Sequence, residues 1–158
     1  TDHYGGSLEN RARLLLEVTD AAIEVWGPGR VGVHLSPRAD LHDMGDDNLA
    51  ETFTYVAREL GKRGIAFICS REKEAGDSLG PQLKAAFGGP YIVNERFTKD
   101  SANAWLASGK ADAVAFGVPF IANPDLPARL KADAPLNEAR PELFYAKGPV
   151  GYIDYPTL

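Results

Sequence analysis

The sequence predicts an α/β protein with four parallel strands, and two observations support this fold class. First, helical stretches with apolar residues every three or four positions alternate with short apolar runs, at intervals of roughly 30 residues or fewer. Such alternation requires crossover connections, which make the strands parallel. Second, the 158 residues are 44% hydrophobic and 25% charged, an ordinary globular composition that argues against wholesale disorder.

The first helix is predicted from Leu8 to Trp26, because apolar residues recur along it at spacings of three and four. Ser7 stands where an N-cap is expected, and Gly27 follows the last apolar residue, where a helix commonly stops. The next apolar run, 31–36, ends at Pro37. Its near-continuous apolar character predicts a strand buried on both faces.

The same alternation then continues along the chain. Helices are expected from Leu49 to about Gly64, from Pro81 to Phe87, and after Thr98, which can cap the helix. Strands are expected over 65–69, 91–94 and 113–116. A short helix is expected over 125–131, and the proline-rich remainder, 134–158, is expected to be a mostly irregular tail.

Two architectures fit four strands connected in this way. One is a small open doubly wound sheet, and the other is half of an eight-stranded (β/α)₈ TIM barrel, whose full form takes about 250 residues. A flavodoxin-like sheet normally has five strands, so the count favours the half barrel, but periodicity alone leaves both open. In either architecture, ligands bind at the carboxyl ends of the strands.

Composition narrows the classes of function. The net charge of −5 argues against nucleic-acid binding, and no apolar run approaches the roughly 20 residues of a membrane span. The single cysteine cannot form an internal disulfide or a Cys-rich zinc site. We therefore expect a cytoplasmic protein without membrane or nucleic-acid partners. The turn-rich start at Thr1 indicates a chain end made by a cut.

The loop after the third expected strand is a candidate phosphate site. It joins a strand end to a helix N-terminus, where free N–H groups and Arg96 could hold a phosphate. Gly117, after the last strand, could bring the backbone equally close. Two neighbouring strand ends of this kind fit the phosphate sites of barrels, which use the last two loops.

Other polar residues are weaker candidates. The loop after the first strand offers oxygen and imidazole groups to a cation, but its ligand spacing matches no known motif, so we expect a solvated loop and no metal; its members are Asp40, His42, Asp43, Asp46 and Asp47. His34 lies within a strand and is either a hydrogen-bonded core residue or points into the barrel end. Cys69 is expected to be an inert core thiol.

Five collinear motifs carry a resemblance to a known family: 1–11 (TDHYGGSLENR), 31–37 (VGVHLSP), 112–117 (DAVAFG), 121–126 (IANPDL) and 151–156 (GYIDYP). Over essentially all its residues the chain resembles the C-terminal half of the old yellow enzyme family, flavin-dependent ene reductases. Within that family, the resemblance points to the branch of bacterial N-ethylmaleimide and nitrate-ester reductases.

This resemblance implies that residues 1–158 form the C-terminal half barrel of a single FMN-binding TIM-barrel domain. It implies cofactor-binding roles for His34, Glu95, Arg96, Phe116, Gly117 and Val118, and a place for Tyr145 beside the substrate. The implied activity is ping-pong reduction of electron-poor alkenes, and of nitrate esters or nitro compounds, with NADH or NADPH reducing FMN. The family's proton donor and substrate-binding pair belong to the N-terminal half, so no catalytic residue is expected in this chain, and a complementary N-terminal half is expected as its partner.

Two positions depart from the family pattern. The family usually has an arginine at position 34, and we hypothesise that His34, with Arg38, replaces it. The family's phosphate-binding arginine is Val118 here, and Arg96 could supply the lost charge. Two other readings stay open: a non-flavin barrel enzyme acting on a phosphorylated substrate, and a non-catalytic half barrel that only associates. The break before Thr1 is expected to be a proteolytic nick or, as the second reading, a deliberate split.

Overall fold

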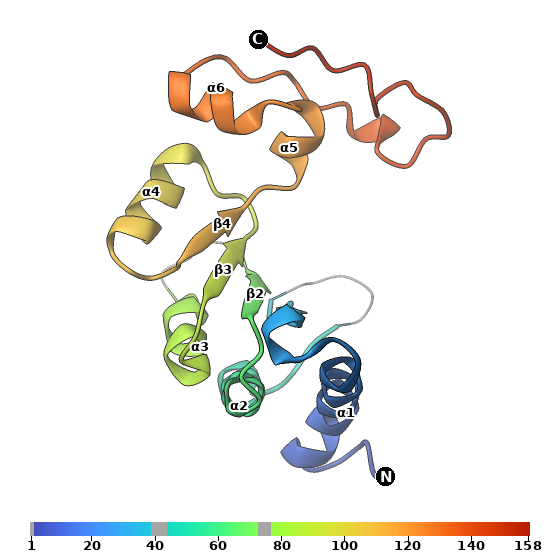
Figure 1. Ribbon diagram of the computed structural model, residues 1–158, viewed down its shortest axis with the longest axis vertical. Helices are drawn as coiled ribbons and strands as arrows, with labels where there is room; N and C mark the ends of the chain where they lie inside the picture. Colours follow the sequence, from blue (N-terminus) through green and yellow to red (C-terminus); the bar gives the residue numbers. More distant parts are fainter. Residues whose placement is uncertain (1, 39–43, 73–76) are drawn as a thin grey trace. The chain divides into compact units, whose positions relative to one another are not determined.

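The computed structural model describes residues 2–38, 44–72 and 77–158 of the chain. They form two compact units, Thr1–Ala115 and Phe116–Leu158. Figure 1 colours the chain from its N-terminus in blue to its C-terminus in red. The first unit contains the sheet, and the second contains short helices and the tail.

The sheet of the first unit has four parallel strands: β1 (Gly32–Leu35), β2 (Phe67–Arg71), β3 (Tyr91–Asn94) and β4 (Ala113–Ala115). Their order in the sheet, β1-β2-β3-β4, is their order in the chain. A doubly wound sheet reverses its strand order at a switch point, and this sheet does not. Sequential order is what a segment of a (β/α) barrel requires, so the topology favours the half barrel over the doubly wound alternative.

Four helices connect and flank these strands: α1 (Leu8–Trp26), α2 (Leu49–Lys62), α3 (Gly80–Phe87) and α4 (Lys99–Ala107). The expected caps are confirmed, since the Ser7 hydroxyl accepts from the Asn10 amide and the Thr98 hydroxyl accepts from the Ser101 amide. α2 and α3 approach closely at Gly61, where a Cβ would lie 2.2 Å from a backbone oxygen.

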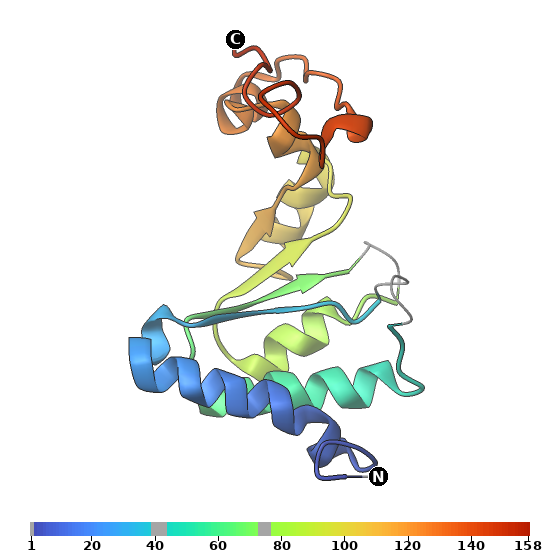
Figure 2. The same ribbon diagram turned by 90° about the vertical axis from the view of Figure 1, so that its right-hand side faces the viewer.

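The helices cover one face of the sheet. Figure 2 shows α1, α2 and α3 on the same side of β1 and β2. Along β1, Val33 and Leu35 are buried while Gly32 and His34 are exposed. The expectation that this strand is buried on both faces is therefore wrong. Successive side chains alternate between faces, and along β1 the described residues cover only the face toward the helices.

Element boundaries differ from the expected ones by a few residues. β2 begins at Phe67 rather than Ile65 and continues to Arg71, whereas β3 spans the expected 91–94. A 3-10 helix η1 (Pro28–Arg30) follows α1. The core of this unit is closed by fully buried apolar residues from α2, β2, α3 and β3, among them Leu60, Ile68, Leu83 and Tyr91.

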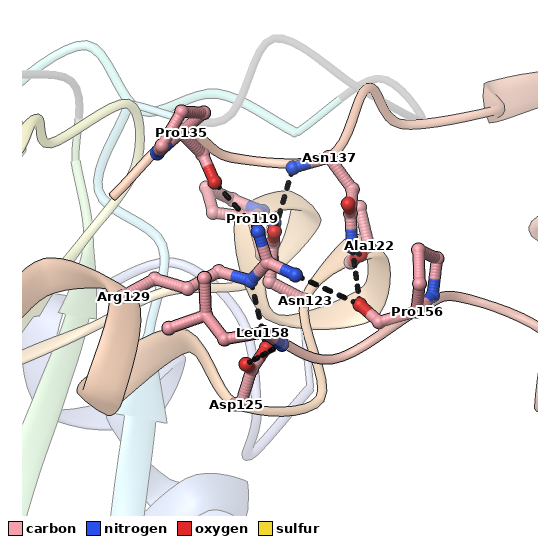
Figure 3. Close-up of polar contacts among 9 residues, drawn as sticks. All are labelled: Pro119, Ala122, Asn123, Asp125, Arg129, Pro135, Asn137, Pro156 and Leu158. Carbon is pink, nitrogen blue, oxygen red and sulfur yellow. Dashed lines mark hydrogen bonds and ion pairs between the residues drawn. The ribbon is translucent and has the colours of Figure 1, made fainter.

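The second unit contains α5 (Val118–Ala122), α6 (Leu126–Ala132) and a 3-10 helix η2 (Pro141–Leu143). α5 was not expected, and the tail after α6 is mostly irregular, as expected. Figure 3 shows how polar contacts fix this tail. The buried Arg129 donates to the carboxylate of Asp125 and to the carbonyl oxygens of Pro135 and Pro156, at 2.8, 2.6 and 2.9 Å. The irregular tail thus has a specific polar core.

Within the described residues, no helix combines the length and the apolar character that crossing a membrane would require.

Candidate functional site at the carboxyl ends of the strands

The carboxyl ends of β1, β2 and β3 bring polar side chains onto the face of the sheet opposite the helices. His34 pairs with Cys69, and Arg71 pairs with Asn94. Because paired residues of neighbouring strands point to the same side and alternate residues share a face, His34, Arg71 and Asn94 belong to one face. The Asn94 side-chain amide donates to the Ala115 carbonyl at 2.7 Å, which ties the end of β3 to the end of β4.

The loop after β3 is held in an uncommon backbone conformation. Glu95 has φ 102° and Arg96 has φ 58°, so two successive non-glycine residues occupy the positive-φ region. Such residues cost free energy and persist only where surrounding contacts fix them. Here the Glu95 carboxylate accepts from Arg71 Nε at 2.6 Å and lies 3.5 Å from Arg96 Nε. One carboxylate therefore bridges two guanidinium groups.

The N-terminus of α4 is less available to an anion than the sequence indicated. Thr98 and Ser101 form a capping box, in which the Ser101 amide donates to the Thr98 hydroxyl at 3.2 Å and the Thr98 amide donates to the Ser101 hydroxyl at 3.1 Å. These two amides already have partners. The cationic loop residues, rather than the free end of the helix, are the better candidates for binding a phosphate.

Arg38, which we had paired with His34, is engaged elsewhere. Its Nε donates to Glu72 at 2.8 Å, and its guanidinium lies 3.0 Å from the carboxylate of Asp77. Glu72 is buried and also accepts from the Ser78 hydroxyl and from the amides of Leu79 and Gly80. This network ties the loop after β1 to the start of α3, so the role of Arg38 here is structural.

A cavity of about 470 Å³ lies at the carboxyl end of β1. His34 lines it together with residues of the following loop and of the start of α2, including Met44, Asp46, Leu49 and Phe53. Asp46 accepts from the Thr52 hydroxyl at 3.0 Å and pairs with Arg11. His34 is thus exposed at the edge of this cavity. This position is more typical of a residue that faces a ligand than of a core histidine.

The remaining candidates of the first unit are the acidic loop after β1 and Cys69. Asp40, His42 and Asp43 of the acidic loop lie outside the described residues. In the part of the chain that the structure describes, no group of three or more histidine, cysteine and acidic residues could hold a metal ion. Cys69 is buried, and burial raises the pKa of its thiol, which agrees with an inert core residue.

The other four expected site residues belong to the second unit. Phe116 and Gly117 follow β4 directly in the chain, and Val118 is the first residue of α5. Val118 is half exposed and brings no charge. Tyr145 lies in the tail after η2, with 99% of its surface exposed.

Sequence reasoning missed Arg71. The signal was present, because Arg71 ends an apolar strand at the edge where ligands bind, but the expected strand stopped at Cys69. Extending it by two residues would have placed an arginine on the face of His34.

A parallel strand-helix alternation in sequential order, with cationic groups at the carboxyl ends of its strands, defines a segment of a (β/α) barrel with a candidate anion-binding site. Comparison with known proteins identifies the family. Residues 1–137 match the NADH:flavin oxidoreductase / NADH oxidase family, and the chain belongs to that family.

Individual relatives agree with this assignment. The whole chain is 44% identical to 12-oxophytodienoate reductase 2 of Arabidopsis thaliana, of which it covers 45%. It is 41% identical to a probable flavin mononucleotide-dependent alkene reductase of Leishmania infantum, of which it covers 44%. The chain thus spans a little less than half the length of these relatives.

Solved structures confirm the fold. Morphinone reductase matches the whole chain with a TM-score of 0.93 and 45% identity, over 44% of its own length. The old yellow enzyme homologue from Zymomonas mobilis matches 99% of the chain with a TM-score of 0.95 and 40% identity, over 46% of its length. The expected resemblance to old yellow enzymes is confirmed, as is the half-barrel fold. These relatives do not favour the non-flavin alternative.

Proposed function

We propose that this chain is the cofactor-binding half of an FMN-dependent oxidoreductase that reduces electron-poor alkenes, with NADH or NADPH as the reductant. The observation that carries the proposal is the match of the entire chain, at about 40% identity or more, to a 12-oxophytodienoate reductase and to a probable flavin mononucleotide-dependent alkene reductase. Nitrate esters and nitro compounds are further candidate substrates. The cytoplasm, where reduced nicotinamide cofactors are available, is the proposed location.

The residues at the carboxyl edge of the first unit suit a flavin nucleotide. Arg71 and Arg96 offer guanidinium groups to a phosphate or to an anionic ring, and His34 stands exposed on the face of Arg71. Glu95 would repel a phosphate, but its carboxylate is shared by the two arginines. The guanidinium groups of Arg71 and Arg96 and the carboxylate of Glu95 together have a net charge of +1. This donor set supports an anionic cofactor at this edge.

We assign the following roles. Arg96 and the backbone after β3 would bind the FMN phosphate. Phe116, Gly117 and Val118 of the second unit are likewise proposed as cofactor-binding residues. His34 would contact the flavin ring, and Tyr145 would lie beside the substrate. Bound FMN supplies the hydride chemistry, while the chain binds and orients it and adjusts the charge around it. No residue of this chain is assigned the proton transfer.

The proposed partner is a complementary N-terminal half barrel. Residues 1–158 would then form one half of a single domain rather than a domain of their own. Within the described sheet, β1 and β4 are edge strands, which present unpaired backbone groups. Pairing both edges with four further strands would close a barrel and remove the edges.

The proposal is tested by purifying the chain together with the complementary half and recording flavin absorption and the number of polypeptides. We expect a yellow complex that reduces an electron-poor alkene with NADH or NADPH. Colourless protein that stays monomeric on sizing would contradict the proposal.

Two variants test the residue roles. Arg96→Ala should release FMN more readily, and unaltered FMN binding would remove Arg96 from the site. His34→Phe should change FMN affinity or reduction potential. If it changes neither, His34 does not replace the family's arginine.

A further inference from the structure

Arg71 ends β2 at the edge where the cofactor is proposed to bind. It lies two residues beyond Cys69, the pairing partner of His34, and it pairs with Asn94 at the end of β3. Arg71 and His34 therefore share the face that the helices leave open, and they occupy neighbouring strands. Among the described strand residues on this face, they are the two that carry a basic side chain.

The contacts of Arg71 fix its direction. Its Nε donates to Glu95 at 2.6 Å, and the side chains of Arg71 and Glu95 are 38% and 24% exposed. Glu95 is itself held at φ 102°. A guanidinium has further N–H groups on its two terminal nitrogens, so the bond through Nε still leaves Arg71 donors for an anion. Glu95 orients the arginine without consuming all of its donors.

Arg71 can supply a permanent positive charge near the flavin, which the neighbouring His34 cannot. A guanidinium stays protonated at any pH at which a protein is folded, whereas an imidazole is charged only near or below its pKa. Reducing a flavin by hydride adds one negative charge to the ring. A permanent cation close to the ring stabilises that charge, and this favours the reduced cofactor over the oxidised one.

We infer that Arg71, oriented by Glu95, is a cofactor-facing cation that stabilises the negative charge of reduced FMN. This inference rests on the proposed function and deepens it. The lone histidine at position 34 would then not have to carry the charge by itself, and Arg38, which is bound to Glu72, would not be needed for it.

The test uses the FMN-loaded protein with both barrel halves and compares Arg71→Met with Arg58→Met, an exposed arginine on α2. Midpoint potential and the affinities for FMN and riboflavin are measured for each variant. We expect Arg71→Met to weaken binding of reduced flavin about tenfold more than binding of oxidised flavin, which lowers the two-electron potential by about 30 mV. Arg71→Lys should recover part of this shift, and Arg58→Met should show none.

The midpoint potential of Glu95→Gln provides a second test, which does not depend on whether the arginine variants fold. Removing the carboxylate leaves the local charge more positive, so the potential should move in the opposite direction, upward. An unchanged potential in both Arg71→Met and Glu95→Gln would overturn the inference. So would a loss of FMN affinity with neither riboflavin affinity nor potential altered, because Arg71 would then bind phosphate. Wild-type protein that binds no flavin would instead overturn the proposed function.

Discussion

Replacing Glu72 by glutamine is the sharpest test of how the loops at the carboxyl edge are held in place. Glu72 follows β2 and is buried, with 3% of its side chain exposed. Its two carboxylate oxygens accept four hydrogen bonds: from Arg38 Nε at 2.8 Å, the Ser78 hydroxyl at 2.8 Å, and the amides of Leu79 and Gly80 at 2.9 and 3.1 Å. Glutamine keeps the size of the side chain but turns one acceptor into a donor.

The expected loss of folding free energy depends mainly on the backbone amides of Leu79 and Gly80. Glutamine can accept at only one of its two ends, so the amide of Leu79 or that of Gly80 loses its carboxylate acceptor and faces an NH₂ group instead; the Gly80 amide also donates to the Ser78 hydroxyl at 3.1 Å. Losing one buried acceptor in this way costs about 1–3 kcal/mol. The remaining bonds lose their charge assistance, at about 1 kcal/mol more. The ion pair with the partly exposed Arg38 adds little, since solvent screens it. The expected loss of folding free energy is about 3 kcal/mol.

Urea unfolding of Glu72→Gln and of wild type measures this loss, with Glu59→Gln as the matched control. Glu59 pairs with the exposed Lys62 at 2.6 Å, so its substitution should cost under about 1 kcal/mol. The amides of Leu79 and Gly80 should exchange with solvent more than a hundredfold faster in Glu72→Gln. A loss no larger than that of Glu59→Gln would refute the reasoning.

Three further predictions concern stability. Arg129→Ala should cost the second unit about 3 kcal/mol, because the buried guanidinium loses three part-buried hydrogen bonds of about 1 kcal/mol each. Faster exchange of the Asn137 amide, which donates to Asn123, would show this loss, and unchanged exchange would count against it. The hydrogen bond from Lys84 lowers the pKa of Asp112, so the ionised carboxylate stabilises the folded state. This stabilisation is complete above the unfolded-state pKa of about 3.8 and is lost as pH falls through the lowered folded-state pKa. Asp112→Asn should remove this part of the acid dependence of the unfolding free energy. Burial raises the pKa of Tyr91 to about 12, so stability should fall as pH rises from about 10 to about 12, and an ultraviolet titration showing Tyr91 ionising near 10 would contradict this.

The periodicity of the sequence predicts the elements but not their neighbours. The spacing of apolar residues identifies α1, and the run 91–94 identifies β3, because each signal lies within the element. Strand order depends on which strands pair, and no local pattern records that. The exposed face of β1 could not be predicted either, because an apolar run does not show what covers each of its faces.

The candidate site, too, could be predicted only in part from the sequence. The loop after β3 could be found from sequence, since it joins a strand end to a capped helix. Its bridge from Glu95 to Arg71 joins residues 24 positions apart, and the contact of Arg129 with Pro156 spans 27. Contacts of this range appear only once the chain is folded. α5 was missed because its five residues are too few to show a helical periodicity.

The sequential order of the strands also bears on how the chain acquires its structure. Each ladder of the described sheet joins consecutive strands whose paired residues are about 20 to 35 positions apart, so these three pairings need no distant segment of the chain. Loop closure of that length costs little extra entropy for each added strand. During synthesis, β2 can add to β1, then β3 to β2, then β4 to β3, in the order in which they leave the ribosome. At each stage of synthesis, the most recently added strand is therefore the edge strand to which the next one pairs.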